Sequence, residues 1–191
     1  MKYNPQIHHR RSIRLQGYDY SQNGAYYVTL CTQNRECLFG EIVKGEMILN
    51  EYGKIVEQCW NNLSNHYDNI ELDAYVIMPN HFHGIILITD NVDNVDNVDN
   101  VGAIHELPLH ESPIQSPQQR RKMLLPKIVG RFKMNSAKKI NQMRNTPGIS
   151  VWQRNYYEHI IRDEKSLENI RNYIITNPAK WQDDDYNLTN R

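Results

Sequence analysis

Two histidines separated by one phenylalanine interrupt the apolar segment "YVIMPNHFHGIILI". Alternate residues of a β-strand project from the same face, so we expect His81 and His83 side by side and Phe82 pointing away. Two imidazoles on a rigid strand make half of a metal shell, which needs at least one more ligand. A pair of hydrogen-bonded core histidines has the same spacing, and the pattern alone leaves both interpretations open.

The missing ligand must come from another part of the chain. The polar candidates in the C-terminal half are Asn177, Asp163, Glu158 and His159. Periodicity does not choose among them. The metal hypothesis therefore depends on which of these residues the fold brings to the histidines.

A nucleophile is the second requirement of such a site. The chain contains no G-x-S-x-G and no P-loop motif, whereas tyrosine occurs twelve times. A phenol beside a divalent cation can attack a phosphodiester, because the cation polarises the phosphate and stabilises the developing charge. Tyr173 lies four residues before Asn177, so both side chains fall near one helix face. Tyr156 and Tyr157, in a strand-like segment, are rival candidates.

Hydrophobic periodicity predicts the elements that must position these residues. The first half reads as a strand, a hairpin turning at Lys44-Gly45, an amphipathic helix and two strands joined at Pro79-Asn80, covering residues 25–33, 38–50, 51–67, 70–78 and 82–89. The second half reads as a basic helix, a strand-like segment and a last helix that is capped by Asp163 and ended by Pro178, covering residues 123–143, 149–162 and 163–178. We expect Pro178 to bias Asn177 away from regular helix.

This order predicts an α+β fold in which helices cover one face of an antiparallel sheet, of the ferredoxin-like or palm type. We expect residues 1–191 to form a single domain. The repeat "DNVDNVDNVDNV" matches neither a helix nor a strand period, so residues 90–119 are expected to form a flexible insert.

The charge distribution points to nucleic acid, although the formal net charge is zero. No acidic residue occurs between Ser112 and Tyr157, and the first acid of the chain is Asp19. One-sided basic segments attract a phosphate backbone. The predicted DNA-binding cations are Arg10, Arg11, Arg120, Arg121, Lys122, Lys127, Arg131, Lys133, Lys138 and Lys139.

Targeting and redox features are absent from the sequence. There is no apolar run of membrane-spanning length, no signal peptide and no C-x-x-C among the three cysteines. A cytoplasmic protein with no membrane partner is the expectation.

Several motifs together resemble a known family. "MPNHFHGIILI" is similar to the histidine-hydrophobic-histidine motif of the single-tyrosine HUH transposases. "RRSIRLQGYDYSQNGAYYVTLCTQNR", "LPKIVGRFKMNSAKKIN" and "VWQRNYYEHIIRDEKSLENIRNYIITNPAKW" resemble the REP-associated tyrosine transposases within that superfamily. The resemblance covers nearly the whole chain except the 90–119 insert. It implies the HUH fold, Mg²⁺ or Mn²⁺ held by His81, His83 and Asn177, and Tyr173 as the nucleophile.

The implied reaction is cleavage of single-stranded DNA next to a hairpin through a 5′-phosphotyrosine, followed by rejoining of new ends. The implied partner is hairpin DNA of the repetitive extragenic palindrome type, bound by a monomer or a homodimer. Two other hypotheses stay open: a domesticated, catalytically silent hairpin-binding module, and a metal-dependent phosphodiesterase that uses water.

Overall fold

The computed structural model of the chain describes residues 15, 18–89 and 122–187. Within them a four-stranded antiparallel sheet has the strand order β4-β5-β1-β6, and β2 and β3 form a separate hairpin. The strands are β1 (Gly24–Cys31), β2 (Gly40–Val43), β3 (Glu46–Leu49), β4 (Ile70–Met78), β5 (His81–Ile88) and β6 (Tyr157–Ile161). The helices are η1 (Gln33–Arg35), α1 (Glu51–Asn61), α3 (Leu124–Met143), α4 (Glu164–Thr176) and η2 (Pro178–Asp183). The predicted α+β class with an antiparallel sheet is confirmed.

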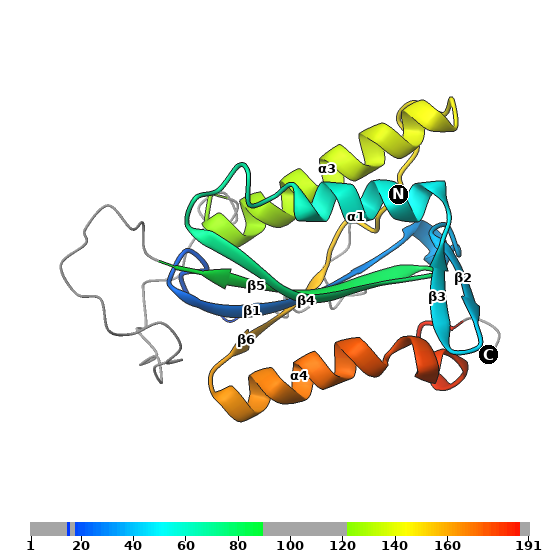
Figure 1. Cartoon of the computed structure of the whole chain (residues 1–191). Helices are drawn as coiled ribbons and strands as arrows, with labels where there is room; N and C mark the ends of the chain where they lie inside the picture. The colour runs from blue at the N-terminus through cyan, green and yellow to red at the C-terminus, as the bar shows by residue number, and fades with distance from the viewer. Residues whose placement is uncertain (1–14, 16–17, 90–121, 188–191) are drawn as a thin grey trace, which may run out of the picture.

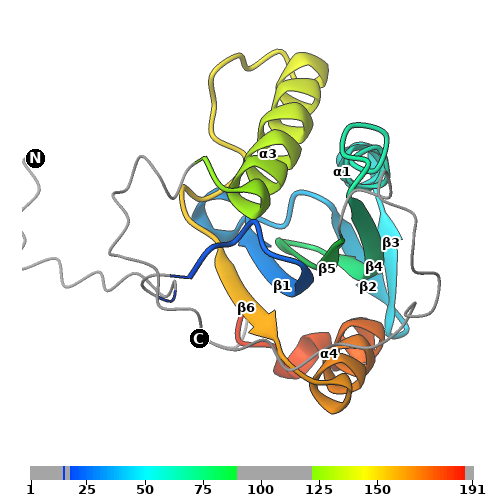
Figure 2. The same cartoon turned by 90° about the vertical axis from the view of Figure 1, so that its left-hand side faces the viewer.

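Helices cover both faces of this sheet. Figure 1 shows α1 and α3 on one face and α4 on the other, and Figure 2 shows the same three layers from the side. The expectation of helices on one face only was therefore wrong. The reason lies in β5, which is buried on both sides: Phe82 packs in the cluster with α1 and α3, whereas Ile85 packs with Ile174 of α4.

Aromatic rings from three elements fill the layer between the sheet and α1 and α3. Trp60 lies 4.6 Å from Phe82 and 5.4 Å from Phe132, measured between ring centroids. Gly84, next along β5, leaves room for Trp60, because a Cβ at this position would lie 2.7 Å from the indole. This tight layer fixes β5, and with it the histidine pair, against the helices.

The strand-like segment 149–162 is a strand only in its last part, β6. Before β6, the backbone makes a single bridge between Thr32 and Trp152. The Trp152 indole donates to Ser136 Oγ at 2.9 Å, and the Lys133 ammonium donates to the Gln153 and Arg154 carbonyls. Side chains of α3 thus take the acceptors that a neighbouring strand would have used.

The last helix begins at its predicted cap and ends before Pro178 as predicted, but Asn177 differs from the expectation. Asp163 is its N-cap, with Oδ1 accepting from the Ser166 N–H at 2.8 Å. Asn177 keeps helical angles, φ −59° and ψ −44°, and Pro178 then opens η2. The expected departure of Asn177 from helical geometry was wrong, because a proline at the start of a new helical turn has no N–H bond to lose.

Some sequence predictions fall outside the described residues. They are the 90–119 insert, the arm that carries Arg10 and Arg11, and the predicted DNA-binding residues Arg120 and Arg121. Among the helices that are described, none is both long enough and apolar enough to span a membrane.

Candidate active site

The histidine pair lies on the face of β5 that is covered by α4. The ring centroids of His81 and His83 are 4.6 Å apart, and the side chains are 0% and 1% exposed. Phe82, between them, packs on the opposite face in the cluster with α1 and α3. The predicted strand geometry of the pair is therefore confirmed.

His81 is held by one of its ring nitrogens and left open at the other. Nδ1 lies 2.8 Å from Asn80 Oδ1, whereas the buried Nε2 has no hydrogen-bond partner. The nearest acid is Asp184, whose Oδ2 lies 3.9 Å from Nε2. Burial lowers the pKa of His81 well below its usual value, and the neighbouring His83 lowers it further, so the ring is neutral at pH 7.

His83 faces a hydroxyl at each ring nitrogen. Tyr27 Oη and Thr29 Oγ1 lie 2.6 and 2.8 Å from Nδ1, and Tyr173 Oη lies 3.4 Å from Nε2. Burial lowers the pKa of His83 to about 3. Two neutral imidazoles side by side are what metal ligation requires, because only the neutral ring has a lone pair to donate.

Tyr173 projects from α4 toward this pair. Its side chain is 41% exposed, and its ring centroid lies 5.3 Å from that of His83. Burial and then the negative charge of Asp184 raise the pKa of Tyr173. The phenol therefore keeps its proton at neutral pH unless a cation or a bound phosphate changes its surroundings.

The two rival tyrosines lie elsewhere on the sheet. Tyr156 packs against the cluster under α1 and α3, on the face away from the histidines. Tyr157, on β6, has its ring 6.3 Å from the ring of Tyr27. The structure thus brings Tyr173, at the predicted helix position, into contact with the histidine pair.

Asn177 lies one turn beyond Tyr173 and is 2% exposed. Its side-chain oxygen Oδ1 is buried with no hydrogen-bond partner. A buried acceptor without a donor is costly unless a ligand satisfies it. Asn177 therefore offers a free oxygen one helix turn from the phenol that contacts His83.

The other candidates for a third ligand have a different role or a different position in the fold. The Asp163 carboxylate caps α4. Glu158 pairs with Val28 in the sheet, and Val28 faces the α1 and α3 side. His159, on β6, pairs with Tyr27 of β1, and its side chain is exposed.

A donor set of two imidazole nitrogens and one amide oxygen fits a divalent cation. Within the described part of the chain, no three His, Cys, Asp or Glu side chains form a metal-binding cluster. A metal site here would therefore depend on Asn177 Oδ1 together with the two Nε2 atoms. Imidazole nitrogens favour Mn²⁺ over the harder Mg²⁺.

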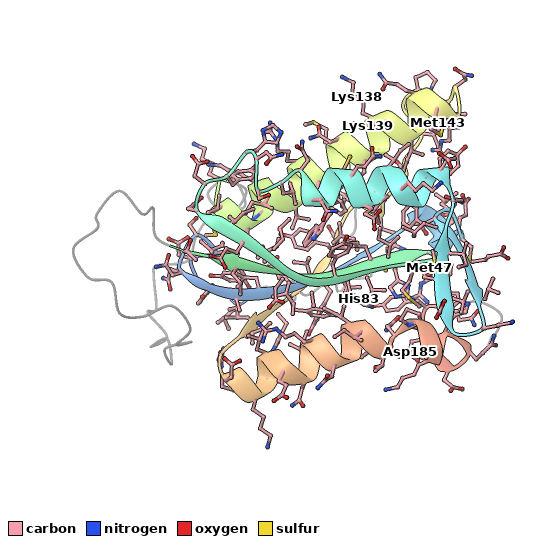
Figure 3. All side chains as sticks on the ribbon, in the orientation of Figure 1. Met47, His83, Lys138, Lys139, Met143 and Asp185 are labelled. Carbon is pink, nitrogen blue, oxygen red and sulfur yellow. The ribbon has the colours of Figure 1, made fainter. Side chains whose placement is uncertain are left out.

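Predicted basic residues of α3 lie on the side of the sheet away from His83. In Figure 3, His83 lies on the α4 side, and Lys138 and Lys139 lie beyond α3 on the opposite side. These two lysines line a cavity between α1 and α3 together with Asn62, His66, Asn135 and Gln142. Lys122 and Lys127 are also exposed.

Two of the predicted cations have partners within the protein. The Arg131 guanidinium lies over the Tyr67 ring and reaches His66 Nδ1 at 3.4 Å. Lys133 is held by two backbone carbonyls, and burial lowers its pKa to about 8. Arg10, Arg11, Arg120 and Arg121 lie outside the described residues.

Sequence reasoning missed the residues that enclose the site. The segment after η2 returns to the histidines, and the Tyr186 ring lies 4.5 Å from that of His81. Arg35 packs over Tyr186 and donates to the Asp185 carbonyl at 3.1 Å. Asn80, read only as a turn residue, contacts His81 directly. The position of Asn80 directly before His81, in "PNHFH", is the sequence feature that could have indicated this role.

Comparison with known proteins gives two curated relatives, and one of them has a functional name. No family model matches the chain. A protein of Haemophilus influenzae (strain ATCC 51907 / DSM 11121 / KW20 / Rd), named "Uncharacterized protein", is 45% identical over 183 residues, which cover 96% of each chain. A second protein of that strain, named "Putative REP-associated tyrosine transposase", is 26% identical over 162 residues, 85% of this chain and 74% of the relative.

A solved structure of a REP-associated tyrosine transposase bound to a REP hairpin has the same fold. The TM-score is 0.50 at 16% identity, covering 90% of this chain and 72% of the other. The resemblance to REP-associated tyrosine transposases is confirmed. The chain belongs to the same family as its 45% identical relative.

Proposed function

We propose that this relative of the REP-associated tyrosine transposases cleaves and rejoins single-stranded DNA next to hairpins through a covalent 5′-phosphotyrosine at Tyr173. The carrying observation is the approach of the Tyr173 hydroxyl to within 3.4 Å of His83 Nε2, with the Asn177 amide one helix turn away. The proposal is supported by a phenol in contact with one of two adjacent neutral imidazoles, and by a buried amide oxygen without a partner one helix turn further on.

In the cleavage step, Tyr173 Oη forms a bond to the scissile phosphorus, and the bond from phosphorus to the 3′-oxygen breaks. The phenol loses its proton and the leaving oxygen gains one, which yields a 3′-hydroxyl and a 5′-phosphotyrosine. The number of phosphodiester bonds is conserved. A second 3′-hydroxyl can therefore reverse the attack and join new ends without an energy source.

His81, His83 and Asn177 would hold the cation in this site. A divalent cation bound there would withdraw electron density from the phosphate and favour the phenolate form of a nearby tyrosine. The protein itself contributes position: α4 is fixed at its start by the Asp163 cap and along its length by Leu167 and Ile174 in the second core cluster. This packing holds Tyr173 within reach of the pair.

Hairpin DNA would meet the protein on more than one face. The exposed lysines of α3 and the Tyr173 hydroxyl lie on opposite sides of the sheet. We expect the duplex stem to contact the α1 and α3 side through its phosphates, and the single-stranded flank to pass an edge of the sheet to Tyr173.

The test is a denaturing-gel search for a protein–DNA adduct with a labelled hairpin oligonucleotide that carries single-stranded flanks. Wild type with Mn²⁺ should give an adduct that resists denaturation and disappears with a chelator. Tyr173→Phe should give none. Tyr157→Phe is the matched control, because it removes another exposed phenol on the same side of the sheet, and it should behave as wild type.

Each competing hypothesis gives a different result on that gel. A phosphodiesterase that uses water releases a free 5′-phosphate and forms no adduct. A silent binding module retains the hairpin in the presence of chelator and forms no covalent product with any metal. An adduct that survives Tyr173→Phe removes the nucleophile assignment.

A further inference from the structure

Asn80 is fully buried at the turn between β4 and β5, and its side-chain amide makes three hydrogen bonds. Nδ2 donates to the Tyr186 carbonyl at 2.7 Å and to the Arg35 carbonyl at 3.2 Å, and Oδ1 lies 2.8 Å from His81 Nδ1. One amide thus ties the histidine to η1 and to the segment that follows η2.

These partners fix which way the amide points. A carbonyl oxygen can only accept a hydrogen bond, so the nitrogen of Asn80 must face Arg35 and Tyr186. The oxygen must then face His81, and because an amide oxygen also only accepts, His81 must carry its proton on Nδ1. The lone pair of His81 is therefore on Nε2, the buried atom without a hydrogen-bond partner.

His83 has no such constraint. Its Nδ1 faces the hydroxyls of Tyr27 and Thr29, which can each donate or accept. The two histidines of the motif thus differ: the partner of His81 dictates its tautomer, and the partners of His83 do not.

We propose that Asn80 is a positioning residue that holds His81 as the Nδ1-protonated tautomer, with Nε2 free for a divalent cation. This inference rests on the proposed function for its purpose, but the tautomer is a property of the metal-free protein. Partners of this kind behind a metal-bound histidine fix ring orientation and tautomer, and their loss typically costs 10- to 100-fold in affinity.

Two substitutions at Asn80 separate positioning from structural support. Asn80→Ala removes all three hydrogen bonds. Asn80→Asp also removes the two that Nδ2 donates, but keeps an acceptor for His81 Nδ1. Thr32→Val is the control, because it removes hydrogen bonds from Thr32 Oγ1 to the Glu36 and Asn80 carbonyls and leaves the Asn80 amide in place.

Mn²⁺ affinity measured calorimetrically without DNA is the first readout. We expect about a 10- to 100-fold loss in Asn80→Ala, whereas Asn80→Asp and Thr32→Val stay near wild type. The unfolding temperature should fall in all three variants. If Asn80→Asp loses as much affinity as Asn80→Ala, or if Asn80→Ala loses none, Asn80 has only a structural role and the proposal is overturned.

The tautomer itself is the second readout and needs no variant. A long-range ¹H–¹⁵N correlation spectrum of metal-free wild type should show His81 protonated at Nδ1. Protonation at Nε2 overturns the inference even if every Asn80 variant fails to fold. An absent Tyr173 adduct with this tautomer in place instead counts against the proposed function and leaves the inference standing.

Discussion

At the scale of the residue, the site consists of polar groups that the fold has deprived of water. His81 Nε2 and Asn177 Oδ1 are buried without a hydrogen-bond partner, and the pKa of His83 is lowered to about 3 by burial. Groups of this kind cost stability when nothing is bound. A bound cation would recover that cost, which is why the same atoms fit a metal site.

Buried neutral histidines make the metal-free protein sensitive to acid. Unfolded histidines bind protons below about pH 6.5, whereas His83 in the folded state does so only near pH 3, and the pKa of His81 is lowered as well. The unfolded state therefore binds more protons as pH falls from 6.5, so the free energy of unfolding should drop, and roughly 2 kcal/mol of the loss by pH 5 should come from His83.

Urea titrations in chelator between pH 7 and pH 5 measure this loss. His83→Gln should reduce the slope, because it removes one of the two buried neutral rings. A free energy of unfolding that stays constant over that range would mean that both histidines bind protons as readily in the folded protein as in the unfolded chain, and so would count against a buried neutral pair.

The sequence predicted these residues to different extents. Spacing placed His81 and His83 on one face, and helix periodicity placed Tyr173 next to Asn177. Neither pattern chose Tyr173 over Tyr156 and Tyr157, because the choice depends on which face of the sheet the last helix covers. The resemblance to the family made that choice, and the structure places the Tyr173 hydroxyl 3.4 Å from His83 Nε2.

At the scale of the element, α4 is the part that completes the site. The buried side chains of α4 are Leu167 and Ile174. Its first turn depends on the Asp163 cap. Asp73 adds a contact from β4, with Oδ2 2.7 Å from Arg171 Nη2. The position of Tyr173 thus depends on a helix with a small apolar interface.

Loss of the Asp163 cap should weaken this helix. Asp163→Ala leaves the Ser166 N–H without its acceptor, and we expect a loss of about 1 kcal/mol in the free energy of unfolding. Asp163→Asn keeps an acceptor at the same position and should retain most of it. Chemical denaturation of both variants measures the difference, and equal stability would show that the cap contributes little.

The predicted element boundaries were correct where they depend on neighbouring residues in the sequence. The β2–β3 turn at Lys44-Gly45 and the Asp163 cap were both predicted from residue type. The segment before β6 was not, since its path depends on Lys133 and Ser136 of α3, which are distant in sequence. Helices on both faces were missed because the order of the elements does not tell which face of the sheet the last helix covers.

At the scale of the whole molecule, the candidate chemistry and the exposed lysines Lys138 and Lys139 of α3 are on opposite sides of the sheet. His83 faces α4, whereas Lys138 and Lys139 lie beyond α3 (Figure 3). Binding and cleavage should therefore be separable by mutation, because each depends on its own side of the sheet.

Lys138→Ala combined with Lys139→Ala should weaken hairpin binding through lost phosphate contacts. We expect the slope of log affinity against log salt to become shallower by up to about 0.9 per lost contact. Lys54→Ala is the control, since this exposed α1 lysine is already paired with Glu51 at 2.8 Å. Fluorescence anisotropy across a salt series measures the slope. An unchanged slope would place the duplex away from these lysines.

The central claim is that DNA becomes attached to Tyr173. Its most direct test is mass spectrometry of wild-type protein after reaction with a hairpin oligonucleotide and Mn²⁺, digestion of the DNA by nuclease, and trypsin cleavage. The account predicts a nucleotide mass on the peptide that contains Tyr173, with fragment ions that place it on that residue. A nucleotide on Tyr157, on Tyr186 or on a residue other than tyrosine would contradict it.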